Sequence, residues 1–220
     1  MSAGLAPHWH TRLLLALLLC VPLAALAAAP GPAPLASSRT LAGYLPSVLV
    51  SVALAGYVSR FGLRSSILVS LIGRPWSSKR RAWQDLGLGA ALAGLVLVLD
   101  ASLSRALAAP ESLAGHSLLP VTLVERAAWC LFALCAGVGE ELVYRGYLQR
   151  QITSSCGSRA LGILLQALLF GIAHGEHGGA AVARFALYGA LFGALAWGRG
   201  SLLPGMLAHV ALDVYAGLAA

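Results

Sequence analysis

The sequence predicts an all-α fold, a polytopic bundle of about six or seven transmembrane helices. Hydrophobic residues make up 59% of the 220-residue chain and charged residues only 10%, whereas a soluble domain is about half apolar and carries roughly 25% charged residues. The apolar residues also fall into separate runs of about 15–20 residues, close to the length that an α-helix needs to cross a bilayer. The 25 glycines suit the close helix–helix contacts of such a bundle.

The apolar runs predict the helices in order. The first, 13–29, is either a cleaved signal peptide or a first transmembrane helix, and its basic flank with the following Pro-Gly-Pro fits both. A retained helix is favoured, because a polytopic protein seldom needs cleavage. The later runs are 41–58, 86–103, 121 to the glutamates near 140, 160–174, 181–197 and 202–218. Asp100 interrupts the third run near its end, and Arg184 lies near the outer end of the sixth.

The distribution of positive charge predicts the topology. The net charge is +7, and six of the fifteen Lys and Arg residues lie between Arg60 and Arg81 in one loop. Basic loops stay in the cytosol, so this loop and the loops 145–159 and 198–201 are expected on the cytosolic side. The excess charge is then a topology signal, and no nucleic-acid partner is expected. The apolar segment 67–72 inside the basic loop is too short to cross and is expected at the interface.

Two adjacent carboxylates and an arginine form the first polar motif, Glu140-Glu141-Leu-Val-Tyr-Arg145. Neighbouring residues on an α-helix point about 100° apart, so the two glutamates are expected to have different roles. Glu141 and Arg145 are i,i+4 and can form an ion pair. Glu140 is left without an arginine beside it, and a poorly hydrated carboxylate of this kind suits a general base.

Two further motifs place polar residues on single helix faces. Phe170 and His174 share a face at i,i+4 spacing, and so do His209 and Asp213. Ionisable residues at membrane depth rarely face lipid. Glu140, His174 and His209 each lie roughly 12–22 Å from the cytosolic end of their helix, so they are expected in the middle of the bundle. On spacing alone, a structural His174 and a His209–Asp213 pair that merely joins helices remain alternatives.

Together the three motifs resemble the CPBP family of intramembrane endopeptidases, which includes the type II CAAX prenyl endopeptidases and the bacterial Abi proteins linked to bacteriocin processing and immunity. The family pattern is EExxxR, then FxxxH, then HxxxN or HxxxD, on separate helices. The resemblance covers 121–220, which divides the chain into a first segment 1–40, the N-terminal transmembrane helices 41–120 and a catalytic bundle 121–220.

The resemblance implies peptide-bond hydrolysis within the membrane. It makes Glu140 the base that activates a water molecule, with His174 helping to hold that water. His209 and Asp213 would stabilise the oxyanion, and Glu141, Arg145 and Phe170 would be supporting residues. An ionised Asp213 cannot donate a hydrogen bond to the oxyanion. It would therefore either be protonated, for which apolar sites in other enzymes give a precedent, or orient His209 instead.

The resemblance leaves metal dependence open, because the family was long labelled a metalloprotease family. Glu140, His174 and His209 could supply a three-ligand zinc site with an open position. The sequence contains no HExxH motif, however, and its four cysteines form no CxxC pair. A glutamate-activated water without a cofactor is the favoured interpretation.

Two other functions compete with proteolysis. A non-catalytic immunity or scaffold protein would use the same polar residues to join helices, and a small proton-coupled transporter would pass protons through Glu140, His174 and His209. For the peptidase, the expected partners are a membrane-anchored protein or peptide substrate and the lipid bilayer. The Ala-, Leu-, Gly- and Arg-rich composition is typical of a high-GC bacterium, so we expect a multi-pass protein of the bacterial cytoplasmic membrane.

Overall fold

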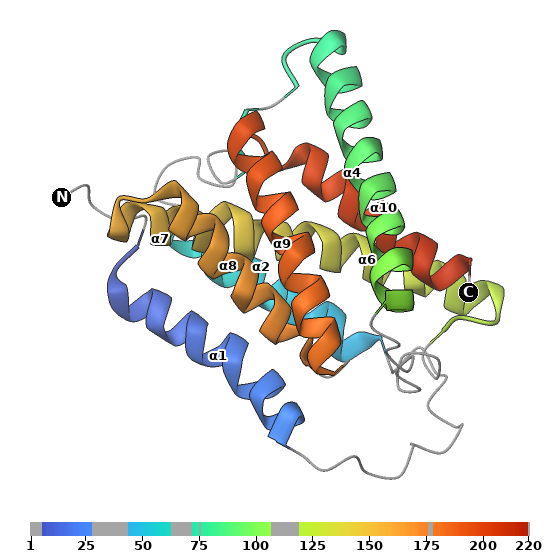
Figure 1. Ribbon diagram of the computed structural model, residues 1–220, viewed down its shortest axis with the longest axis horizontal. Helices are drawn as coiled ribbons and strands as arrows, with labels where there is room; N and C mark the ends of the chain where they lie inside the picture. Colours follow the sequence, from blue (N-terminus) through green and yellow to red (C-terminus); the bar gives the residue numbers. More distant parts are fainter. Residues whose placement is uncertain are drawn as a thin grey trace.

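The protein is an assembly of helices (Figure 1). The structure, a computed structural model, describes residues 6–27, 44–62, 72–74, 76–106, 119–175 and 178–219. The helices are α1 (His8–Ala27), α2 (Leu45–Gly62), α4 (Lys79–Ala106), α6 (Leu123–Glu140), η3 (Glu141–Leu148), α7 (Gln149–Cys156), α8 (Arg159–Ala173), α9 (Gly179–Arg199) and α10 (Leu203–Leu218). Within these ranges the one strand-like contact is an isolated antiparallel bridge between Gly73 and Ser201, and no sheet forms. The predicted all-α fold is confirmed.

Helices α6, η3 and α7 follow one another without a break and form a single rod from Leu123 to Cys156. Thr122 caps the start of the rod in a capping box with Glu125. The segment 145–159 is expected as a cytosolic loop, but the helix continues through Arg145, which is only 1% exposed, so that residue is not in a loop. The side of the membrane on which the segment ends stays a prediction. An arginine can lie inside the bundle here because Glu141, at i−4, neutralises its charge.

The rod is the centre of the packing. Helix α10 packs against both α6 and α4, α2 packs against α6, and α8 packs against α9. Figure 1 shows α1 (blue) along one edge of the bundle and α4 (green) at the opposite edge, crossing α10 (red). A Cβ atom on Gly137 would lie 2.8 Å from Val210 Cγ2, and one on Gly171 would lie 2.9 Å from Ala186 Cβ. Small residues therefore allow the close helix contacts that the composition indicated.

Within the described residues, three helical stretches are long and apolar enough to cross a membrane. They are Lys79–Arg105 with 27 residues, Leu123–Cys156 with 34 and Gly179–Arg199 with 21. Leu45–Arg60, Arg159–Ala173 and Leu203–Leu218 are shorter apolar helices, so the count of six or seven crossings stays a prediction. Large apolar side chains cover the outside of the bundle, for example Leu49, Val98, Leu131 and Leu164, each more than half exposed. Of the segment expected at the interface, 67–71 lies outside the described residues.

Helix α1 is tied to the rod by polar contacts. The ring of His10 is fully buried, accepts or donates a 2.8 Å hydrogen bond with the Tyr147 hydroxyl, and stacks on Tyr57 with 4.0 Å between ring centroids. The side chain of Gln151 bonds both the N–H and the carbonyl of Ala6, at 3.2 and 2.9 Å. Further along α1, Leu14 is completely buried. The helix is thus packed as a member of the bundle.

The charged residues inside the expected third and sixth crossings pair with each other. Arg184 Nη1 lies 2.9 Å from Asp100 Oδ1 and also bonds the Ser104 hydroxyl. The Tyr188 hydroxyl donates to the same Asp100 oxygen at 2.8 Å. This cluster joins α4 to α9 and neutralises both charges, which accounts for their presence in apolar helices.

Candidate active site

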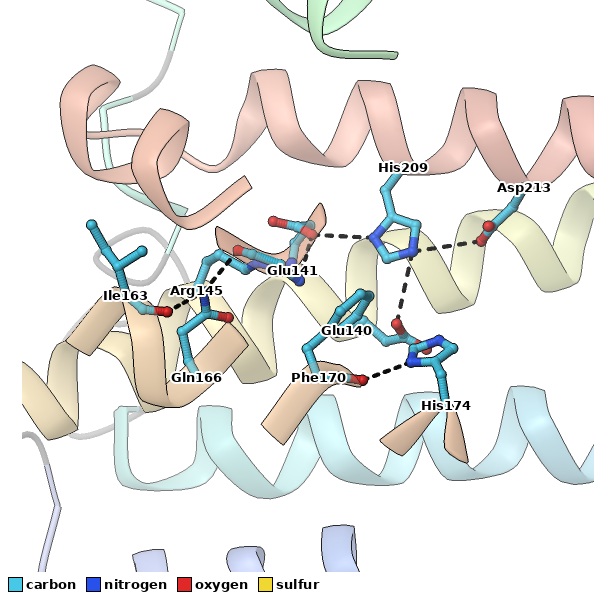
Figure 2. Close-up of polar contacts among 10 residues, drawn as sticks. Glu140, Glu141, Arg145, Ile163, Gln166, Phe170, His174, His209 and Asp213 are labelled. Carbon is cyan, nitrogen blue, oxygen red and sulfur yellow. Dashed lines mark hydrogen bonds and ion pairs between the residues drawn. The ribbon is translucent and has the colours of Figure 1, made fainter. Parts of the chain in front are cut away.

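Four of the six polar residues of the three motifs come together at one cavity. Glu140 ends α6, His174 directly follows the last residue of α8, and His209 and Asp213 lie one turn apart on α10. All four line a cavity of about 630 Å³ whose walls come from α1, α2, α6, η3, α8, α9 and α10. Figure 2 shows their side chains directed toward one another. Residues far apart in the sequence therefore share one chamber.

His209 is the centre of the polar contacts. Its Nε2 atom lies 3.7 Å from Glu140 Oε2 and 3.9 Å from Asp213 Oδ2, both within ion-pair distance. Its Nδ1 atom lies 3.1 Å from Glu141 Oε1. Since a carboxylate paired with a cation can only accept, Nδ1–H donates to Glu141. That hydrogen bond fixes the ring so that Nε2 faces the cavity.

Glu141 and Arg145 form the ion pair expected from their spacing, with 2.9 Å between Arg145 Nη1 and Glu141 Oε1 and both side chains fully buried. The guanidinium carbon lies 4.4 Å from the ring centre of Phe170 and 5.2 Å from that of Phe192, so two aromatic faces add cation–π attraction. A Cβ atom on Gly205 would lie 3.0 Å from Glu141 Oε2, so this glycine leaves room for the carboxylate. Glu141 therefore connects Arg145 to His209 through one oxygen.

The two adjacent glutamates stand at a change of helix type. The α-helix ends at Glu140, and a π-helix covers Glu141–Leu148, every residue of which is buried. π-Helical turns are rare and frequently occur at functional sites. The Glu141 side chain is fully buried on the Arg145 side, whereas that of Glu140 is 27% exposed and lines the cavity. The two carboxylates therefore face different surroundings, as the helix geometry predicted.

The ring of His174 is held in one orientation. Helix α8 ends at Ala173, and the His174 backbone has left the helical region with φ −103° and ψ 22°. Nδ1–H donates to the Phe170 carbonyl at 2.8 Å, because a carbonyl oxygen can only accept. The ring stacks on Phe185, with 4.1 Å between centroids and 16° between planes. In the neutral ring Nε2 then carries the lone pair, and His174 lines the cavity.

The zinc alternative requires three metal-ligating side chains that can surround one ion. No group of three His, Cys, Asp or Glu side chains in the part of the chain that the structure describes has an arrangement that could hold a metal ion. Glu140 and His209 do approach each other, but the geometry does not complete the three-ligand set of Glu140, His174 and His209. The zinc alternative therefore finds no complete ligand set among these residues, and metal dependence stays a prediction.

Several residues of the site carry no polar motif and were not predicted. Phe185 and Phe192 lie on one face of α9 at i,i+7 spacing and stack on His174 and Arg145 respectively. Trp129 Nε1 donates to the Asp213 carbonyl at 2.7 Å and lines the cavity. The recurrence of aromatic residues along the run 181–197 is the only signal that pointed to the first two, and it equally suits an ordinary core.

Comparison with known proteins agrees with this geometry. Residues 122–215 match one protein-family model, described as type II CAAX prenyl endopeptidase Rce1-like. No curated protein and no solved structure matches the chain. The matched segment begins at the N-cap of α6 and ends inside α10, so it contains the three motifs. The match confirms the resemblance that the motifs indicated: residues 122–215 are similar to the Rce1-like type II CAAX prenyl endopeptidase family.

Proposed function

We propose that this protein is an intramembrane endopeptidase that hydrolyses a peptide bond of a membrane-associated protein or peptide. The family is one of membrane-embedded CAAX-type peptidases, which are hydrolases. The observation that carries the finer proposal is that Glu140, His174, His209 and Asp213 line one cavity. The setting that we propose is the bacterial cytoplasmic membrane, which about six or seven transmembrane helices would cross.

Glu140 is the proposed general base. Its carboxylate is partly exposed to the cavity and is not the partner of Arg145, so it is free to take a proton from water. His174 is suited to hold that water, because Nδ1 is committed to the Phe170 carbonyl and Nε2 can accept a hydrogen bond. The stacked Phe185 ring keeps this acceptor in place.

His209 is the proposed oxyanion donor. The role requires a proton on Nε2, and Nδ1 already donates to Glu141. His209 therefore acts as the imidazolium, donating from both ring nitrogens, with Glu141 and Asp213 balancing its charge. In this arrangement Asp213 orients His209, which removes the need for a protonated carboxylic acid at that position. A preorganised donor in a poorly hydrated site is worth about 2.7–4 kcal/mol of transition-state stabilisation.

The test is Glu140→Gln in the purified full-length protein, assayed in detergent micelles with membrane-anchored peptides. We expect cleavage to fall at least about a thousandfold, because an amide cannot act as a base, while the thermal unfolding midpoint stays within a few degrees. Glu125→Gln on the same helix is the matched control, because Gln also supports a capping box, and it should cleave normally. Full activity in Glu140→Gln would refute the role of Glu140. Absence of cleavage in the unchanged protein would refute the peptidase itself.

We further propose that the hydrolysis needs no metal ion. The proposal is supported by the donor geometry at Glu140 and His209 described above. Dialysis against a strong zinc chelator should leave the cleavage rate unchanged, and metal analysis of the active protein should find less than one zinc per chain. Loss of activity that added zinc restores would overturn this assignment without touching the peptidase proposal.

A further inference from the structure

A second cavity lies beside the catalytic one, between α4, α9 and α10. Its volume is about 510 Å³, within the range of about 300–1,000 Å³ that is usual for ligand pockets. It shares Phe185, His209, Asp213 and Ala216 with the catalytic cavity. The two cavities therefore meet at the residues that we propose to bind the oxyanion.

The lining of the second cavity is apolar and aromatic. Val96 and Leu97 of α4 face Tyr188 and Phe192 of α9 across it, with Leu212 on α10. Its charged lining residues are already engaged. Arg145 pairs with Glu141, and Asp100 accepts from both Arg184 and Tyr188. His209 contacts Glu141 and Asp213. A cavity of this kind favours an apolar group over a charged one, because a charge would lose its hydration without gaining a new partner.

The position of this cavity limits what it can hold during catalysis. A peptide whose scissile carbonyl lies at His209 has Glu140 and His174 on the side of the catalytic cavity. The second cavity opens on the other side of the same junction, next to Phe170 and Arg145. A substrate side chain next to the scissile bond can therefore enter it directly.

We infer that the cavity between α4, α9 and α10 is the side-chain specificity pocket of the peptidase, and that it accepts a bulky apolar residue adjacent to the scissile bond. This inference rests on the proposed function. Leu97 is the best position to test, because it lines the pocket yet is 37% exposed, so changes in size are tolerated there. Its neighbour Val98 is 65% exposed and does not line the pocket, which makes it a matched control.

The experiment compares Leu97→Trp, Leu97→Ala and Val98→Trp, using the full chain in detergent micelles and a synthetic peptide mixture that samples every residue pair. Cleavage sites are mapped by mass spectrometry. In Leu97→Trp, cleavage next to Leu, Phe or Tyr should fall at least about tenfold relative to cleavage next to Gly or Ala. A factor of about ten is the lower end of the discrimination between substrates that differ by one methylene group in an apolar pocket. Leu97→Ala should shift the preference in the opposite direction, and Val98→Trp should keep the parental profile.

Several results would overturn the inference. An unchanged profile in both Leu97 variants means that no substrate side chain enters the pocket. A uniform fall at every site means that the cavity holds something other than the discriminating side chain, such as a lipid chain. If Leu97→Trp fails to fold, the direction of the shift in Leu97→Ala decides alone. A parental protein that cleaves no peptide refutes the proposed function together with the inference, whereas normal cleavage with unchanged preference refutes the inference only.

Discussion

Replacing Arg145 by methionine is the sharpest test of how the catalytic rod is held together. The substitution keeps most of the side-chain length, so Phe170 and Phe192 still have an apolar partner, but it leaves the Glu141 carboxylate without its cation. An exposed pair would contribute only about 0–1 kcal/mol. Both side chains are 0% exposed here, and removing one partner of a buried pair costs about 3–5 kcal/mol.

The assay is thermal unfolding of the purified protein in detergent, followed by tryptophan fluorescence. For a chain of this length, a loss of about 3–5 kcal/mol corresponds to a fall of roughly 6–20 °C in the unfolding midpoint. The double variant Glu141→Gln with Arg145→Met removes both charges and keeps an oxygen that can accept from His209 Nδ1. It should therefore recover about 1–3 kcal/mol relative to Arg145→Met alone, which is the coupling expected of contacting residues.

Arg126 provides the control, because it lies on the same rod and is exposed. Arg126→Met should change the free energy of unfolding by no more than about 0.5 kcal/mol. The reasoning fails if Arg145→Met is as mild as the control. It also fails if the double variant is less stable than Arg145→Met, because the carboxylate would then not be the source of the cost.

Three further predictions concern packing and the N-terminal helix α1. Gly171→Ala should destabilise the protein by about 1–3 kcal/mol through overpacking of α8 against α9, since the new Cβ would lie 2.9 Å from both the backbone N and the Cβ of Ala186. The control Gly94→Ala, which has nothing within 4 Å of the new Cβ, should instead stabilise the protein by up to about 1 kcal/mol. Equal effects of the two substitutions in chemical denaturation would contradict the close contact of α8 with α9. His10→Phe should lower the free energy of unfolding by about 1–3 kcal/mol, because it removes the hydrogen bond to Tyr147 from a fully buried site. Intact mass spectrometry of the membrane-purified protein should find α1 still attached. A mature chain that starts after residue 27 would show that α1 is not part of the working bundle.

The helices could be predicted because an apolar run is a local property of the sequence. What could not be predicted is where the catalytic rod ends. A charge at Arg145 normally indicates the edge of the membrane, and here it is compensated by Glu141 and by two phenylalanines from other helices. Those rings become neighbours only when α8 and α9 pack, so no local pattern reveals them.

In the candidate site too, local sequence patterns predicted some contacts, whereas tertiary packing produced the others. The i,i+4 spacings placed Phe170 with His174 and His209 with Asp213 on shared faces, because helix geometry alone determines that. The contact of His209 Nδ1 with Glu141 joins residues 68 positions apart, and the π-helical turn beside it depends on tertiary packing. Glu141 was therefore predicted as a partner of Arg145 only, and its second contact came from the structure.

The pairing of Glu141 with Arg145 within one helix also bears on the order of assembly. Each isolated charge at the centre of a membrane helix raises the cost of insertion by about 2.5–3.5 kcal/mol, but these two residues lie one turn apart and can meet as soon as the helix forms. Nothing from α8, α9 or α10 is needed for that contact. The segment that bears the proposed base can therefore leave the ribosome as a helix that has already neutralised its arginine, and His209, synthesised 68 residues later, docks onto a carboxylate that is already in place.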